Sequence, residues 1–410
     1  MKDNIYKMLP SPSELIKKKL NVANQKGLNI NNHIHTPFSF SSFSDMKVVF
    51  ELAESEQIDV LGINDFYTAD GFAEFKDMAF KANVFPVFNM EYIGLLKEEQ
   101  AGDIRVNDPN NPGRTYLCGK AFKFPFKLDS NYADMLGQVI DESQVQVKEM
   151  VKKTNSYFSS LGLQLNFSLS EVKKRFAKNL VRERHLSRAI RVAVFENFSE
   201  TEKRISIFEK ILKMDVTEQL LSSEAGIENA IRSKLLKKGG YAFVEETESS
   251  FLPVTKLVKL ILNAGGIPTY PVLLDDPEGN FTGFEGDWEK LYKRLVSLGI
   301  YAVELIPGRN DKKILADFVN FFDEKGFIVT FGTEHNTPDM QPLTVYCRNG
   351  AELGDALQRI QYRGVCVLAA HQFLLASGEE GYVMMDGAAR INEKQDFELL
   401  GELVLQEFFK

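Results

Sequence analysis

The sequence predicts an α/β fold, because short apolar runs alternate with amphipathic helical stretches along most of the chain. Seven of the apolar runs have the length and the composition of buried strands. These runs are Leu28–His33, Asp59–Ile63, Val84–Met90, Thr115–Phe122, Ile267–Pro271, Ala302–Ile306 and Phe327–Phe331. Seven strands with helical returns between them indicate either a barrel or a doubly wound sheet.

The helices between the strands are indicated by apolar residues at helical spacing and by residues that favour helix ends. The first begins after Ser44 or Asp45, either of which can cap it. A second ends at the Gly265-Gly266 pair, which favours a helix stop. Two more begin near Asp287 and Asp311. Each of these helices adjoins a predicted strand, as βα units require.

A long polar segment, residues 123–248, separates the fourth and fifth strands and is almost wholly helical in character. It is too long for a crossover connection, so we interpret it as a helical insertion. Ser168 and Glu171 have the spacing of a capping box, and the apolar residues that follow predict one amphipathic helix that continues to Leu186. In the tail after the last strand, the predicted helices are Ala351–Tyr362 and Asp396–Phe409.

The composition is that of an ordinary globular protein, with 44% hydrophobic and 26% charged residues among 410. No apolar stretch reaches the roughly 18 to 20 residues that span a bilayer, and the N-terminal segment lacks the apolar core of a signal peptide. We therefore expect a cytoplasmic protein without membrane contact. Three cysteines are too few for a disulfide framework, and a net charge of -8 makes a nucleic-acid partner an unfavourable hypothesis.

Histidine is scarce, and two of the five histidines stand close together at the end of the first strand. In a strand, residues i and i+2 point to the same side, so His33 and His35 can present two imidazoles to one ion. A surface or structural role is an equally good reading of this pair alone. Polar residues also end other strands, and the carboxyl ends of parallel strands converge in space. These residues are Asn64, Asp65, Glu91, Glu304, Glu334 and His335.

Taken in order, these motifs resemble those of the PHP-domain family, the polymerase and histidinol phosphatase superfamily. The resemblance covers roughly residues 28 to 340. Its motifs are HIHT at His33–Thr36, IDVLGINDF, Glu91, RHLSRAI at Arg184–Ile190, AGGIPTYP, GIYAVELI and GTEHNTP. It implies a distorted seven-stranded (β/α)7 barrel of the TIM-like kind and a metal-dependent phosphoesterase activity. It also implies a discontinuous barrel of residues 1–122 and 249–341, the insertion at 123–248, and a C-terminal extension at 342–410.

The metal ligands that the resemblance implies are only partly present. Five positions where the family has further ligands carry other residues, namely Phe40, Phe66, Tyr116, Tyr270 and Asn336. Four positions that surround a single metal in the family are retained as His33, His35, Glu91 and Glu334. The resemblance therefore implies one divalent ion, and two imidazoles with two carboxylates suit Zn, Mn or Fe.

The remaining candidates have roles that follow from their chemistry and from their places in these motifs. His335 is a candidate general acid or further ligand, and Asp65 a candidate general base. Tyr116 and Tyr270 are candidate hydrogen-bond donors to an anionic intermediate, although each can equally be a satisfied polar residue. The candidates for holding a phosphate group are Arg114, Arg184, His185 and Arg309, for which a surface ion pair is the alternative for each arginine.

The leading hypothesis is a single-metal hydrolase that acts on a phosphorylated small molecule. One alternative is a PHP-like protein that binds a ligand or partner without hydrolysing it. Another is a metal-dependent enzyme of a different reaction type, such as a lyase or an amidohydrolase. The oligomeric state is left open.

Overall fold

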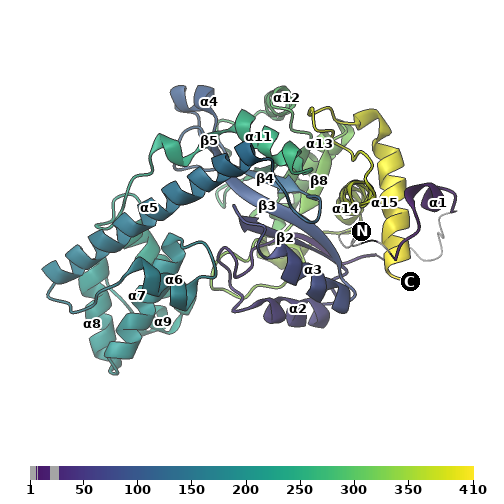
Figure 1. The fold of residues 1–410 in the computed structure, drawn as a ribbon. Helices are drawn as coiled ribbons and strands as arrows, with labels where there is room; N and C mark the ends of the chain where they lie inside the picture. Colours follow the sequence, from purple (N-terminus) through teal and green to yellow (C-terminus); the bar gives the residue numbers. More distant parts are fainter. Residues whose placement is uncertain (1–5, 7, 19–26) are drawn as a thin grey trace.

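The computed structural model describes residues 6, 8–18 and 27–410. Within these residues, seven strands follow one another around a nearly closed sheet in the order β1-β2-β3-β4-β6-β7-β8 (Figure 1). Their bounds are Ile30–Ile34, Val60–Phe66, Phe85–Leu95, Arg114–Lys120, Ile267–Val272, Ala302–Leu305 and Ile328–Phe331. Each overlaps one predicted run, so the α/β fold with a distorted seven-stranded barrel is confirmed. A two-residue strand, β5 (Leu252–Pro253), pairs with the end of β3.

The barrel is parallel except at β4, which runs antiparallel to both β3 and β6. It closes between β1 and the segment after β8, at the carboxyl ends of both. The backbone N–H of His35 donates to the carbonyl of Glu334 at 2.7 Å, and the N–H of Glu334 donates to the carbonyl of His33 at 2.9 Å. The seam of the barrel therefore carries three of the predicted site residues.

Helices pack around the outside of the barrel where the sequence predicts them. Asp45, rather than Ser44, caps α2 by accepting from the N–H of Val48, and Asp287 and Asp311 cap α12 and α13 in the same way. The bounds of these helices and of their neighbours are α2 Met46–Ser55, α3 Phe72–Lys81, α4 Lys97–Ala101, α11 Val254–Asn263, α12 Trp288–Ser297 and α13 Lys312–Glu324.

The segment between β4 and β5 folds into helices with a hydrophobic cluster of their own. The predicted continuous helix from Ser168 to Leu186 is wrong, because α6 ends at Phe176 and α7 begins at Glu183. The link between them lets Leu180 pack in the barrel cluster and its neighbour Val181 in the insertion cluster. The helices are α5 Ser130–Ser160, α6 Leu169–Phe176, α7 Glu183–Asn197, α8 Thr201–Leu212, α9 Glu218–Ser222, α10 Glu224–Ile231 and the π-helical turn η2 Arg232–Leu236.

The C-terminal residues cover the amino end of the barrel. The helix predicted at Ala351–Tyr362 is wrong in its bounds, because residues 351–352 form β10, which pairs with β9 (Tyr346–Cys347), and α14 spans Asp355–Ser377. Side chains of α14 bind main-chain carbonyls at the starts of strands, with Gln361 donating to Ile30 at 2.8 Å and Gln372 donating to Pro86 at 3.0 Å. Helix α15 (Lys394–Phe408) packs against α14, and α1 (Pro12–Ile16) packs against α15 (Figure 1). Among the helices described, none combines the length and the apolar character needed to cross a membrane.

Candidate metal centre

The carboxyl ends of the strands open into a cavity of about 830 Å³. The barrel side of this cavity carries His33, Glu91, Glu304 and Glu334. The opposite side is formed by the insertion, with residues of α5, the start of α7 and η2. The insertion therefore covers the mouth of the barrel, while α14 covers the other end.

Three of the predicted ligands bring donor atoms together, and two of them, His33 and Glu91, line this cavity. The Nε2 atoms of His33 and His35 lie 3.4 Å apart, and Nε2 of His35 lies 3.2 Å from a carboxylate oxygen of Glu91. All three side chains are buried. Ligand atoms around a tetrahedral zinc ion with bonds of about 2.0 to 2.1 Å are separated by roughly 3.3 Å. The spacing therefore fits ligands of one ion.

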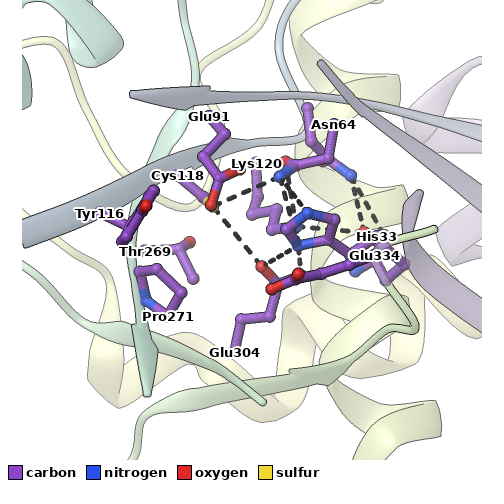
Figure 2. Close-up of polar contacts among 12 residues, drawn as sticks. His33, Asn64, Glu91, Tyr116, Cys118, Lys120, Thr269, Pro271, Glu304 and Glu334 are labelled. Atoms are coloured by element: carbon purple, nitrogen blue, oxygen red, sulfur yellow. Dashed lines mark hydrogen bonds and ion pairs between the residues drawn. The ribbon is translucent and has the colours of Figure 1, made fainter. Parts of the chain in front are cut away.

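His33 is fixed in the tautomer that a metal ligand needs. Its Nδ1 atom lies 2.8 Å from a carboxylate oxygen of Glu304 (Figure 2). Burial would raise the pKa of Glu304, but His33 and Lys120 lower it to about 2, so this carboxylate is ionised and only accepts hydrogen bonds. His33 must then donate from Nδ1, so its Nε2 is an acceptor, which lies 2.9 Å from the side-chain amide nitrogen of Asn64, a contact that a bound ion would replace. A carboxylate behind a histidine is the usual support of a metal-binding imidazole.

Lys120 is a buried cation that the sequence analysis missed. Its ammonium group donates to Glu304, to the carbonyl of Asn32 at 3.1 Å and to Oδ1 of Asn64 at 3.3 Å (Figure 2). The three donors of the ammonium group are thus all used. The two-residue period of a strand could have predicted its position. Lys120 lies two residues after Cys118 and four after Tyr116, so all three side chains point to the same face of β4.

His35 and Glu91 are held uncharged in the protein alone. Burial lowers the pKa of His35 to about 4, so the imidazole is neutral and can act as a ligand. Burial also raises the pKa of Glu91, and the charges of Glu334 and Glu304 add to this effect while His33 opposes it. A positive ion between the two side chains would favour the carboxylate and reverse this shift.

A second group of donor atoms, from His33, Cys118 and Glu304, also lies close together among the described residues. Burial raises the pKa of the Cys118 thiol, and the charge of Glu304 raises it further. Lys120 already neutralises Glu304. A protonated thiol is a poor ligand, so this group supports His33 rather than forming an ion site of its own.

Glu334 does not join the other three predicted ligands. Its carboxylate accepts from both terminal nitrogens of Arg309, one at 2.8 Å, and from the amide of Asn336. Burial would raise the pKa of Glu334, but Arg309, His33 and His35 lower it, so the group is ionised. Glu334 lines the cavity as a paired carboxylate, and it is not in the group of close donor atoms that His33, His35 and Glu91 form among the described residues.

The predicted roles of Asp65 and His335 in acid-base chemistry do not fit their contacts. Asp65 accepts from the N–H of Thr36 at 2.7 Å and from the hydroxyl of Ser39 at 2.6 Å. The ring nitrogens of His335 are used by the hydroxyl of Thr333 at 2.7 Å and the carbonyl of Gln341 at 2.8 Å. Neither residue lines the described cavity. The polar atoms of both residues already have partners within the fold, and their roles in catalysis stay predictions.

Two of the predicted substrate contacts are likewise engaged elsewhere. The hydroxyl of Tyr270 donates to Glu285 at 2.7 Å and is buried away from the cavity. Nδ1 of His185 accepts from the N–H of Arg182 at 2.9 Å and closes the first turn of α7. Their structural roles replace the predicted contacts with substrate. Tyr116, by contrast, lines the same cavity as Glu91, from the neighbouring strand β4 (Figure 2).

All three predicted arginines line the cavity, but only one lacks a carboxylate partner among the residues described. Arg114 pairs with Asp108 and Glu246, and Arg309 pairs with Glu334. Arg184 instead lies over the ring of Phe40, with 4.8 Å from its guanidinium carbon to the ring centre. Arg182, which was not among the phosphate-binding candidates predicted from the sequence, lies in the same way over Phe66 at 4.7 Å.

Comparison with known structures shows a shared fold. A candidate metal-dependent phosphoesterase from Bifidobacterium adolescentis superposes with a TM-score of 0.55 over 82% of this chain and 96% of its own, at 12% sequence identity. An amidohydrolase from Chromobacterium violaceum, with bound sulfate and no metal, has a TM-score of 0.48 over 78% of this chain and 93% of its own, at 14% identity. No family model matches the chain, and no curated protein matches its sequence. The likeness to the Bifidobacterium protein places this chain among proteins of the same fold.

Proposed function

We propose that the protein is a hydrolase that uses one divalent ion, held by His33, His35 and Glu91. The observation that carries this proposal is the approach of their three donor atoms to 3.2 and 3.4 Å, with His33 and Glu91 lining a cavity of about 830 Å³. A cavity of this size holds a small molecule. Two histidines and a carboxylate with open positions suit Zn, Mn or Fe. The resemblance to PHP domains and the shared fold support the same reaction class.

The ion supplies, when bound, polarisation of a phosphoryl or acyl oxygen and a lower pKa for a bound water. The residues of the chain then hold and orient the reactants. Glu304 fixes the ring of His33 through Nδ1. Arg309 keeps Glu334 ionised on the cavity wall, where its carboxylate can accept a hydrogen bond from a water molecule. The hydroxyl of Tyr116 lines the same cavity and can donate to an anionic oxygen.

A phosphorylated small molecule is the proposed substrate. The cavity wall carries cationic side chains from both the barrel and the insertion, which favour an anionic ligand. These side chains are Arg114, Arg182, Arg184, Arg232, Lys237, Lys238 and Arg309. The planar guanidinium group matches the oxygens of a phosphate group.

A second candidate function is binding of such a ligand without hydrolysis. The observation that favours it is the full engagement of Asp65 and His335, the residues predicted to transfer protons. A metal-bound protein without a general acid would hold a phosphate ester and release it unchanged.

Metal content and turnover of the same preparations test the proposal. Protein incubated with Zn or Mn and then desalted should hold about one ion per chain and should hydrolyse a member of a panel of phosphate monoesters. Glu91→Gln should lose both properties, whereas Glu99→Gln, a buried glutamate that pairs with Arg294, should keep both. Bound metal without turnover supports the second candidate. A metal-free wild type, or turnover unchanged in Glu91→Gln, contradicts the proposal.

A further inference from the structure

Arg182 and Arg184 are distinguished among the arginines that line the cavity by their lack of a hydrogen-bonded carboxylate. Within the described residues, Arg184 has no ion pair, and Arg182 comes only within 3.9 Å of a carboxylate oxygen of Glu183. The other lining arginines are paired, Arg114 with Asp108 and Glu246, Arg232 with Glu183, and Arg309 with Glu334. Arg184 is therefore left without a carboxylate partner among the described residues, and Arg182 has only the long contact with Glu183.

Both free guanidinium groups are held in place by phenylalanine rings. Arg184 lies over Phe40 at 4.8 Å and Arg182 lies over Phe66 at 4.7 Å. A guanidinium group stacked on a ring is oriented without using its N–H donors, whose edges stay available for a ligand. The two phenylalanine rings therefore position the guanidinium groups and leave their N–H donors available.

The same rings place the guanidinium groups beside the proposed metal site. The rings of Phe40 and Phe66 lie nearly parallel to the imidazole of His35, at interplanar angles of 14° and 13° and centre distances of 5.6 and 5.1 Å. Each guanidinium group thus lies over a ring that neighbours a proposed metal-binding imidazole. Both arginines also line the same cavity as His33 and Glu91.

We propose that Arg182 and Arg184 form an anion subsite that binds a phosphate group of the ligand, independently of the metal ion. The assignment of phosphate as part of a substrate rests on the proposed function, whereas the subsite itself rests on the two arginines. Burial and the nearby Arg232 lower the pKa of Arg184 to about 10, and an anion beside the guanidinium group would relieve this repulsion. The insertion thus contributes the anion-binding part of the site, and the barrel contributes the ion.

Phosphate binding to the metal-free protein tests this subsite without any turnover. Calorimetric titration of chelator-treated protein with inorganic phosphate in a chloride buffer should show binding to the wild type. Arg182→Gln and Arg184→Gln should each weaken it by about tenfold to hundredfold, because each removes a charge-assisted hydrogen-bonding group. Arg175→Gln is the matched control, since Arg175 also lies over a phenylalanine, at 5.0 Å, but is exposed and pairs with Glu196.

Conservative variants and a second anion make the outcome decisive. Arg184→Lys keeps the charge and should retain part of the affinity that Arg184→Gln loses. Acetate at equal ionic strength should bind much more weakly than phosphate. The subsite is overturned if the wild type does not bind phosphate, if both glutamine variants bind it as the wild type does, or if acetate binds equally well. Since no metal is present, a failure of the proposed metal site would leave these results unchanged.

Discussion

His35 at the carboxyl end of the barrel and His371 at its amino end are both fully buried, and burial lowers the pKa of each to about 4. Their partners differ. In His371, Nδ1 accepts from the N–H of Tyr382 and Nε2 donates to the carbonyl of Gly265, both at 2.9 Å. In His35, Nε2 faces the Nε2 atom of His33 and the carboxylate of Glu91.

The difference separates a structural histidine from a candidate ligand. Each nitrogen of His371 meets a main-chain group of the opposite hydrogen-bonding type, so the residue is satisfied by the fold alone. At the other end, Nε2 of His35 lies 3.4 Å from Nε2 of His33 and 3.2 Å from a carboxyl oxygen of Glu91, an arrangement that either a proton on Glu91 or a bound cation would satisfy. Residue type, burial and pKa are the same, and the identity of the neighbouring atoms decides the role.

The largest effect on stability is expected at the carboxyl end, where charges are buried. Lys120→Met leaves Glu304 as an uncompensated buried carboxylate and should lower the free energy of unfolding by about 3 to 5 kcal/mol. The double variant Lys120→Met with Glu304→Gln removes both charges and should recover most of this loss. Urea unfolding of the metal-free proteins measures both. Equal stability of the single and double variants would show that the pair is not the source of the effect.

Replacing each histidine with leucine tests directly whether His371 has a structural role and His35 a metal-binding role. His371→Leu leaves a buried N–H and a buried carbonyl without partners and should lower stability by about 3 kcal/mol, with metal binding unchanged. His35→Leu removes a proposed ligand and should weaken zinc binding at least about a hundredfold, since loss of mere support for a ligand already weakens it by about 10- to 100-fold. Its effect on the stability of the metal-free protein should be under about 1 kcal/mol. Zinc titration and urea unfolding measure these effects in both variants. Equal losses of zinc affinity and of stability in the two variants would contradict the different roles of the two histidines.

At the amino end, α14 approaches β8 too closely for a side chain at Gly364. A Cβ atom there would lie 2.0 Å from the carbonyl oxygen of Val329. Gly364→Ala should therefore lower stability by about 2 to 3 kcal/mol through overpacking. Gly137→Ala on α5 is the control, because a Cβ there meets no atom within 4 Å, and it should raise stability by about 0.5 to 1 kcal/mol. Thermal or urea unfolding measures both changes in stability. If both variants were stabilised, or both destabilised, the close packing of α14 on β8 would be contradicted.

The smallest expected effect is the pH dependence that His371 confers. Its pKa is lowered from 6.5 to about 4 by burial, so the unfolded chain takes up a proton at a higher pH than the folded protein. This contribution to stability is complete above pH 6.5 and is lost as the pH falls toward 4. Between pH 7.5 and pH 5 it amounts to about 1 to 2 kcal/mol. Unfolding measured at both pH values should show a smaller difference in His371→Leu than in the wild type.

The elements and the grouping of His33, His35 and Glu91 were predictable, because the elements and the two histidines follow local patterns and Glu91 ends a predicted strand. Buried strands form continuous apolar runs, and the two-residue period of a strand places His33 and His35 on one side. The end of α14 was missed because the helix is buried against both β8 and α15, so its apolar residues occur on all sides and hide the helical period.

The remaining site residues depend on turns and distant partners that periodicity does not encode. Glu334 and His335 both have positive φ angles, of 66° and 54°, so the alternation of a strand stops before them. This turn directs the His335 ring toward Thr333 and Gln341 instead of the cavity. Tyr270 was misassigned for a related reason, since its partner Glu285 lies in the loop after β6.

X-ray absorption spectroscopy of the zinc-loaded protein tests the central claim most directly, because it identifies the atoms bound to the ion. Ligation by His33, His35 and Glu91 predicts about one ion per chain with imidazole nitrogen and oxygen neighbours only, at about 2.0 to 2.2 Å. A sulfur neighbour at about 2.3 Å would instead place the ion on Cys118, and a protein that retains no zinc would contradict the metal centre altogether.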